Sequence, residues 1–199
     1  MPGSTTTPPA VRKATAQELG PLCDTFAAAF YADPLMSWVF PDADERLSRL
    51  RGVFDAIARA TFPRGRIETV PGEHAGAIWV PPDAEVDEAA MMEEMLVGAG
   101  PHEDRIRALF ELIDPEHPQD APHHYLFVLG TRPEWQSHGL GSALLRSVLD
   151  PADADGVPAY LEASSERNRL LYLRHGFEVI KTVWMPDGPP VWCMWREPR

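Results

Sequence analysis

The sequence predicts one mixed α/β domain of the α+β kind, with its helices concentrated in the first half. Three observations lead to this prediction. The length of 199 residues is typical of one domain. A hydrophobic fraction of 44% and a charged fraction of 24% are sufficient for a core. Helical apolar spacing dominates up to Ile113, and strands alternate with two helices after Pro122, without an internal repeat or a linker.

The elements follow from local signals along the chain. Residues 1–10 are rich in Thr and Pro and are expected to be a disordered tail, with residues 11–199 forming the domain. A first helix is expected to begin near Gly20, with Pro21 in its first turn. It should end before Asp33-Pro34, because the residue preceding a proline is pushed out of the α region.

Further elements follow at regular intervals. Asp42 with Glu45 resembles a capping box, and the apolar residues behind it predict a second helix up to Ala58. Apolar runs at 66–70 and 75–80 flank a turn and predict a hairpin. The remaining expected helices are 87–97, 102–113, 139–149 and 168–175, and the remaining expected strands are 124–130, 159–163, 177–184 and 191–196.

The charge balance and the cysteine count exclude several classes of protein. The net charge is −12 and the sequence pI is near 4.9, whereas nucleic-acid binding and docking on anionic membranes need clustered Lys and Arg. No apolar run approaches the roughly 20 residues of a membrane span, and the N-terminus lacks the apolar core of a signal peptide. Cys23 and Cys193 have no metal-site spacing. We expect a cytoplasmic protein with no nucleic-acid, membrane or metal partner, and cationic substrates such as amines are compatible with the charge.

A polar turn between the strand at 124–130 and the helix at 139–149 carries the most informative motif. The N-terminus of a helix presents unpaired N–H groups and binds phosphates. Gly139 and Gly141 would let a backbone approach an anion closely, although a Gly-x-Gly pair alone also fits an ordinary helix start. No Lys-Ser or Lys-Thr follows, which excludes a P-loop, and Leu144 replaces the third glycine of a dinucleotide fingerprint.

The wider pattern is more specific. Gln136, Gly139 and Gly141 form a Gln-x-x-Gly-x-Gly motif, and 160–164, Asn168 and 172–178 follow it. In order and spacing this resembles the GCN5-related N-acetyltransferase (GNAT) superfamily. Segments 156–162 and 191–194, with the Trp79-Val80-Pro81-Pro82 strand end, look like the puromycin N-acetyltransferases within that superfamily. The resemblance covers nearly the whole chain from Val11.

The resemblance implies a GNAT acyl-CoA N-acyltransferase fold, in which a central mixed, mostly antiparallel sheet is flanked by helices. It implies acetyl-CoA as co-substrate, no metal, and a small-molecule primary amine as acceptor, with an aminonucleoside-antibiotic-like amine as one candidate. Neither cysteine has the context of a nucleophile, so direct attack is expected. Two alternatives stay open: a peptide N-terminus or lysine as acceptor, and a non-catalytic acyl-CoA sensor. The expected assembly is a monomer or a homodimer.

The resemblance also implies which residues bind the cofactor. Backbone groups of Leu129 and Thr131 would hold the pantetheine arm like an added strand, and the turn would hold the diphosphate. Ser137 and His138 depart from the small and basic residues usual there, so the affinity for CoA is expected to depend on pH through His138. The expected cofactor-binding residues are Leu129, Gly130, Thr131, Gln136, Ser137, His138, Gly139, Leu140, Gly141, Ser142 and Asn168.

Two side chains are candidates for catalysis. Tyr172 occupies the family's general-acid position, and a phenol with a reference pKa of about 10 can donate to a thiolate; a plain core tyrosine is the alternative. Glu162 ends a strand beside the site and is a candidate base, with a solvent-facing glutamate as the alternative. Asn168 is expected either to bind the cofactor arm or to cap a helix.

The acceptor pocket is expected to come from the first half of the chain. Phe30, Tyr31, Trp38 and Phe40 form an aromatic cluster around two prolines, which suits a flat or apolar amine. Trp79 on the hairpin could join this cluster. The alternative is a hydrophobic lid packed on the sheet.

Overall fold

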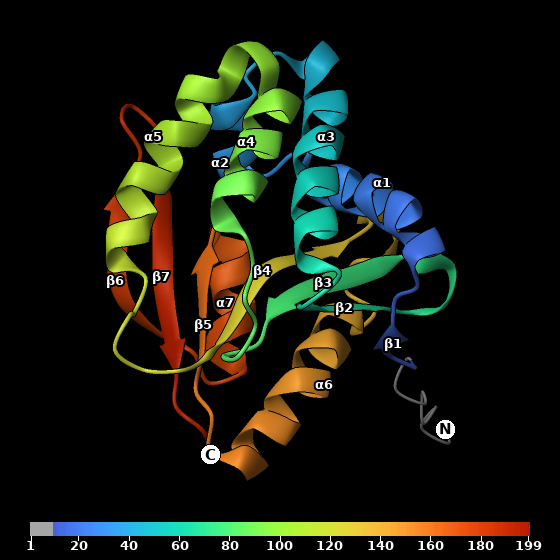
Figure 1. The fold of residues 1–199 in the computed structure, drawn as a ribbon, viewed down its shortest axis with the longest axis vertical. Helices are drawn as coiled ribbons and strands as arrows, with labels where there is room; N and C mark the ends of the chain where they lie inside the picture. The colour runs from blue at the N-terminus through green and yellow to red at the C-terminus, as the bar shows by residue number, and fades with distance from the viewer. Residues whose placement is uncertain (1–9) are drawn as a thin grey trace, which may run out of the picture.

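A seven-stranded sheet runs through the molecule in the computed structural model, which describes residues 10–199 (Figure 1). The expected tail at 1–10 lies outside the described residues, apart from its last residue. The strand order is β1-β2-β3-β4-β5-β7-β6, and every neighbouring pair is antiparallel except β4 and β5. The strands are β1 (Arg12–Lys13), β2 (Arg66–Thr69), β3 (Ala75–Val80), β4 (His124–Thr131), β5 (Ala159–Ala163), β6 (Glu178–Trp184) and β7 (Pro190–Arg196).

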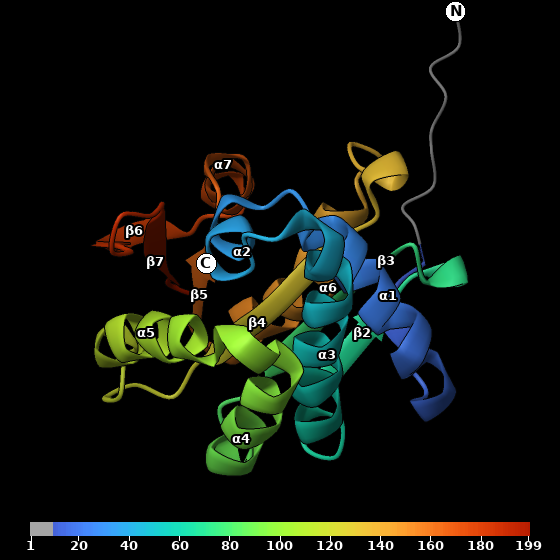
Figure 2. The same cartoon turned by 90° about the horizontal axis from the view of Figure 1, so that it is seen from above.

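Helices cover both faces of this sheet. They are α1 (Leu19–Phe30), α2 (Pro34–Val39), α3 (Ala43–Thr61), α4 (Glu88–Ala99), α5 (Glu103–Ile113), α6 (Leu140–Asp155) and α7 (Glu166–Arg174). Seen from above, α3, α4 and α5 lie in front and α6 lies behind them (Figure 2). The expected mixed, mostly antiparallel sheet flanked by helices is confirmed.

The sheet separates two hydrophobic cores. Side chains of successive strand residues point to opposite faces, so Tyr160 of β5 packs into the core beneath α1–α5 while its neighbour Leu161 packs into the core against α6. Phe26 is fully buried in the first core, and Leu144 in the second. Among the described residues, the two cores have no residue in common.

Strands β4 and β5 separate halfway along their length, and this separation positions the site. Their parallel ladder pairs only His124–Leu126 with Ala159–Leu161. Beyond Leu126, β4 continues to Thr131 and stays paired with β3, while β5 continues to Ala163 and stays paired with β7. Within residues 10–199, no strand pairs with the β5-facing edge of β4 after Leu126. Backbone groups of that edge are therefore open to a ligand.

Besides the two-residue strand β1, which was not predicted, three elements differ from the sequence prediction. The helix α2 was not predicted: Asp33 caps it by accepting hydrogen bonds from the N–H groups of Leu35 (3.0 Å) and Met36 (3.2 Å), and Pro34 begins it. Asp42 does cap α3, accepting from the N–H of Asp44 at 2.9 Å. Glu45 does not complete the expected capping box, because its carboxylate pairs with Arg49 instead.

The third difference is that α6 extends to Asp155 through Pro151 rather than ending at residue 149. Proline lacks an N–H and leaves the carbonyl four residues earlier without its helical donor. That carbonyl belongs to Ser147, and it accepts a hydrogen bond from the Arg66 guanidinium at 2.9 Å. Arg66 of β2, far away in the sequence, thus supplies the hydrogen bond that the Ser147 carbonyl lacks within the helix.

Candidate active site

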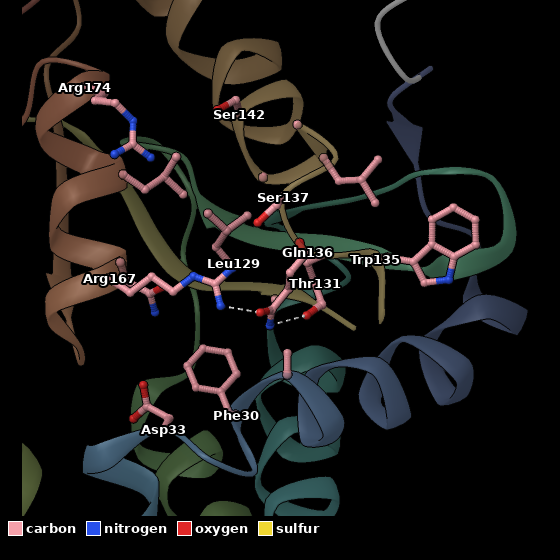
Figure 3. Close-up of a pocket in the computed structure, with 17 residues that line it drawn as sticks. Phe30, Asp33, Leu129, Thr131, Trp135, Gln136, Ser137, Ser142, Arg167 and Arg174 are labelled. Atoms are coloured by element: carbon pink, nitrogen blue, oxygen red, sulfur yellow. Dashed lines mark hydrogen bonds between the residues drawn. The ribbon is translucent and has the colours of Figure 1, made fainter. Parts of the chain in front are cut away.

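A cavity of about 430 Å³ opens where the end of β4, the start of α6 and one side of α7 meet (Figure 3). Leu129, Gly130 and Thr131 line it from the open edge of β4. The other lining residues are Ala29, Phe30, Asp33, Trp135, Gln136, Ser137, Gly139, Leu140, Gly141, Ser142, Arg167, Asn168, Leu171 and Arg174. Every expected cofactor-binding residue except His138 is in this set.

The turn before α6 owes its shape to two left-handed residues. Ser137 has φ of 65° and Gly139, the residue before α6, has φ of 80°. A Cβ on Gly139 would meet nothing within 4 Å, so glycine is favoured there by its positive φ and not by lack of space. Gly141 has an ordinary φ, and a Cβ there would meet Leu171 at 3.5 Å and enter the cavity. The first turn of α6 therefore faces the cavity with its unpaired N–H groups exposed.

Positive charge reaches this cavity from α7 rather than from the turn. Arg167 and Arg174 project from α7 toward the turn (Figure 3). Arg167 donates a hydrogen bond across the cavity to the Gln136 side chain, which in turn donates to the Thr131 carbonyl at 3.2 Å. His138 is exposed, lies outside the lining set, and has its Nδ1 2.9 Å from the Gln136 carbonyl. Sequence reasoning missed both arginines, because nothing local aims α7 at the turn.

A second, smaller cavity of about 110 Å³ adjoins the first. The two share Phe30, Leu129 and Asn168 as walls. Apolar side chains of α2, α3, α4 and α5 form about half of the second cavity, and apolar residues of β4 form much of the rest. Its polar lining side chains are Tyr125, Glu162, Ser164, Asn168 and Tyr172.

Tyr172 lines the second cavity and is 5% exposed. Burial, with the Asp33 carboxylate as a lesser cause, raises the pKa of Tyr172 above its ordinary value. The phenol is therefore fully protonated at neutral pH and able to donate. Asn168 is not the cap of α7, because Ser165 takes that position and accepts from the Asn168 N–H at 3.4 Å. The Asn168 side chain lines both cavities instead.

Glu162 is a buried carboxyl rather than a solvent-facing one, with a side chain that is 11% exposed. Its Oε2 accepts a hydrogen bond from the Tyr125 hydroxyl at 2.8 Å, and its Oε1 lies 3.9 Å from Nδ1 of His117. Burial raises the pKa of Glu162 to about 7, although the Tyr125 hydrogen bond acts in the opposite direction. A carboxyl that is half ionised near neutrality can take and release a proton readily.

Asp33 is a second buried carboxyl that sequence reasoning did not place at the site. It lines the larger cavity, caps α2, and accepts a hydrogen bond from the Ser164 hydroxyl at 2.6 Å. Burial raises the pKa of Asp33 to about 6. The Asp-Pro pair was a visible helix-start signal. Its approach to Ser164 at the end of β5 had no sequence signal.

The expected acceptor residues are only partly at the cavities. Phe30 lines both. Tyr31 and Trp38 line neither: the Tyr31 hydroxyl donates to the Ala43 carbonyl at 3.2 Å, and the Trp38 indole donates to the Pro186 carbonyl at 3.0 Å. Trp79 is fully buried on the opposite face of the sheet, in the core against α6, because it shares the regular alternation of Ala75 and Ala77 along β3. Helices α3, α4 and α5 take the place of these three residues around the smaller cavity.

Known proteins resemble this chain over more than half of its length. A model of the acetyltransferase (GNAT) family matches residues 60–177. The chain is 24% identical over 212 residues to an uncharacterised N-acetyltransferase of Schizosaccharomyces pombe, which covers 96% of this chain and 84% of the relative.

Solved structures share the fold. A Corynebacterium glutamicum protein, described as histone acetyltransferase HPA2 and related acetyltransferase, is 26% identical with a TM-score of 0.71 and covers 97% of this chain and 98% of its own. The PaiA N-acetyltransferase of Thermoplasma acidophilum, in complex with coenzyme A, is 12% identical with a TM-score of 0.57, covering 94% of this chain and 98% of that one. With a matching family model over more than half its length, the chain belongs to the GNAT family of acetyltransferases.

Proposed function

We propose that this protein transfers the acetyl group of acetyl-CoA to a primary amine of a small molecule by direct attack. The observation that carries the proposal is the junction of two cavities at Phe30, Leu129 and Asn168. One cavity has the open strand edge and the helix start expected for CoA. The other has a protonated phenol and a carboxyl that titrates near neutrality.

The residues of the larger cavity fit acetyl-CoA. The open edge of β4 at Leu129–Thr131 offers backbone groups to the amides of the pantetheine arm, as an added strand would use them. The start of α6 offers N–H groups to the diphosphate. Arg167 and Arg174 offer charge-assisted hydrogen bonds to phosphate oxygens.

The chemistry divides between two side chains of this chain. When bound, acetyl-CoA supplies an acyl group as a thioester. The Glu162 carboxylate takes a proton from the ammonium of the acceptor, so that the neutral amine can form the new C–N bond. Tyr172 gives its proton to the sulfur as the C–S bond breaks, and the second proton shed by the nitrogen restores the Tyr172 hydroxyl. One proton per turnover therefore leaves through Glu162.

The small size of the second cavity supports a small acceptor over a peptide. Six helices and three strands contribute to its walls, and its volume is about 110 Å³. The likeness of 156–162 and 191–194 to puromycin N-acetyltransferases keeps an aminonucleoside-type amine among the candidate acceptors.

The proposal is tested by measuring thiol release from acetyl-CoA with a panel of primary amines, with the acetylated product identified by mass spectrometry. We expect amine-dependent release by the parent protein. The variant Gly141→Val should lose acetyl-CoA affinity in calorimetry, because its side chain enters the cavity, whereas Arg146→Val, exposed on the same helix, should not. Tight acetyl-CoA binding without thiol release for any amine would indicate a sensor instead of an enzyme.

A further inference from the structure

We infer that the acceptor is a primary amine with a single positive charge, attached to a compact apolar group that the smaller cavity encloses. This inference rests on the proposed function and narrows its substrate class. It excludes polyamines, guanidino-amines and lysine side chains in peptides as preferred acceptors.

The charge of the cavity wall is the first argument. Within residues 10–199, Glu162 is the only charged residue among those that line the smaller cavity, and no Lys or Arg lines it. One carboxylate can pair with one ammonium. The other buried carboxyl, Asp33, lines the larger cavity and already accepts a hydrogen bond from Ser164. A second cation placed among the apolar side chains of α2–α5 would have no partner there, which is strongly unfavourable.

The chemistry of the remaining wall is the second argument. Met36, Phe54, Met95, Ile106, Leu109 and Phe110 line the cavity from α2, α3, α4 and α5. None offers a hydrogen bond to a polar substrate. The polar residues lie elsewhere: Tyr125 is on β4, Glu162 and Ser164 are at the end of β5, and Asn168 and Tyr172 are on α7. One side of the cavity therefore suits the amine and the other suits an apolar body.

The size of the cavity sets the third limit. Its volume of about 110 Å³ is somewhat smaller than the apolar cavity of about 150 Å³ that binds benzene. Met36 and Met95 are unbranched and change rotamer easily, so the wall can adjust to a ring or a branched alkyl group. A phenyl or isobutyl group next to the amino group matches this space.

Steady-state rates of thiol release at saturating acetyl-CoA test the inference. The probes are benzylamine, phenethylamine and isoamylamine against 1,4-diaminobutane, agmatine and a lysine peptide with an acetylated N-terminus. We expect kcat/KM to be on the order of 100-fold higher for the monoamines, as a buried unpaired charge implies.

A variant that adds the missing charge gives the converse test. Phe110→Glu places a second carboxylate in the wall and should shift the preference toward diamines, while the neutral Phe110→Gln should not. Met36→Glu repeats the test from another helix in case Phe110→Glu does not fold. Equal or higher kcat/KM for diamines or the peptide in the parent protein would overturn the inference and leave the proposed function standing. Absence of thiol release with every amine would overturn both.

Discussion

Burial acts in the same direction on two side chains of the smaller cavity and favours the uncharged form of both. It raises the pKa of Tyr172, which is protonated at neutral pH in any case. It raises the pKa of Glu162 to about 7, so that a carboxyl that is normally ionised is half ionised. The same physical cause thus keeps the acid protonated and brings the pKa of the base close to neutral pH.

Removing only the hydroxyl of Tyr172 tests its role. Tyr172→Phe keeps the ring that packs edge-on against Phe177 with centroids 5.9 Å apart. We expect acetyl-CoA affinity to change little and kcat to fall by about 10²- to 10⁴-fold, the range for a lost general acid. Thiol-release assays measure kcat, and calorimetry on the same preparation measures the affinity for acetyl-CoA. A normal kcat with a lowered melting temperature would make Tyr172 a packing residue.

The ionisation of Glu162 predicts a pH profile. The carboxylate is the active form, so kcat/KM should rise with pH through about 7 and level off above it. Glu162→Gln should lower the rate by about 10²-fold or more and remove this rise. The control is Glu178→Gln, an exposed carboxyl on β6, measured with the same amine so that the amine's own ionisation cancels. An unchanged profile in Glu162→Gln would assign the base elsewhere.

At the scale of elements, α7 and the turn before α6 face one another across the larger cavity. Arg174 projects into the cavity and His138 lies outside its lining. Arg174→Ala should therefore weaken CoA binding by about 10-fold and reduce its dependence on salt, because one charge-assisted contact to phosphate is lost. His138→Ala should leave the affinity and its pH dependence unchanged. Titration calorimetry at two salt concentrations measures both variants, and the opposite ranking would restore His138 to the site.

Elements with strong local signals were predictable from the sequence. The strand, turn and helix over 124–149 carry an apolar run, two glycines and a helical apolar stripe in a continuous segment. The sequence analysis predicted this helix only over 139–149, whereas α6 continues through Pro151, with the freed Ser147 carbonyl bound by Arg66 of β2. The six-residue α2 was too short to show a period of 3.6.

The candidate site was predictable only where its residues share a local motif. The turn residues and Tyr172 follow from sequence order. The wall of the smaller cavity is instead assembled from six helices and three strands, and its apolar residues have the same sequence pattern as ordinary core residues. Trp79 follows the regular alternation of β3 with Ala75 and Ala77, but no local signal shows which face of that strand meets the helices around the smaller cavity. The same holds for Asp33, which reaches Ser164 only through the fold.

For the whole molecule, the buried carboxyls make folding stability depend on pH. The pKa of Glu162 is raised to about 7 and that of Asp33 to about 6, so these two groups bind more protons in the folded chain than in the unfolded chain between about pH 4 and pH 7. Their contribution to stability is present below that window and is lost as pH rises through it. The pKa values of His117, His124 and His175 are lowered by burial and act in the opposite direction, so the part due to Glu162 is measured as a difference between parent and variant.

The variant Glu162→Gln isolates one part of this dependence. Compared with the parent, the variant should have an unfolding free energy at pH 8, taken relative to that at pH 5, that is higher by on the order of 2 kcal/mol, because glutamine does not titrate. Urea unfolding at both pH values measures the difference. A parent protein and variant with parallel pH dependence would show that Glu162 titrates normally in the folded chain.

The separation of the two hydrophobic cores by the sheet bears on how such a protein can diverge. Helices α3, α4 and α5 pack on one core and line the smaller cavity, the proposed acceptor site. Helix α6 packs on the other core, and its N-terminus lines the larger cavity, the proposed acetyl-CoA site. Substitutions in distant, separately packed regions tend to have additive effects. A lineage can therefore exchange its acceptor by altering the first three of these helices while the acyl-donor machinery stays intact, which makes the two specificities separately evolvable.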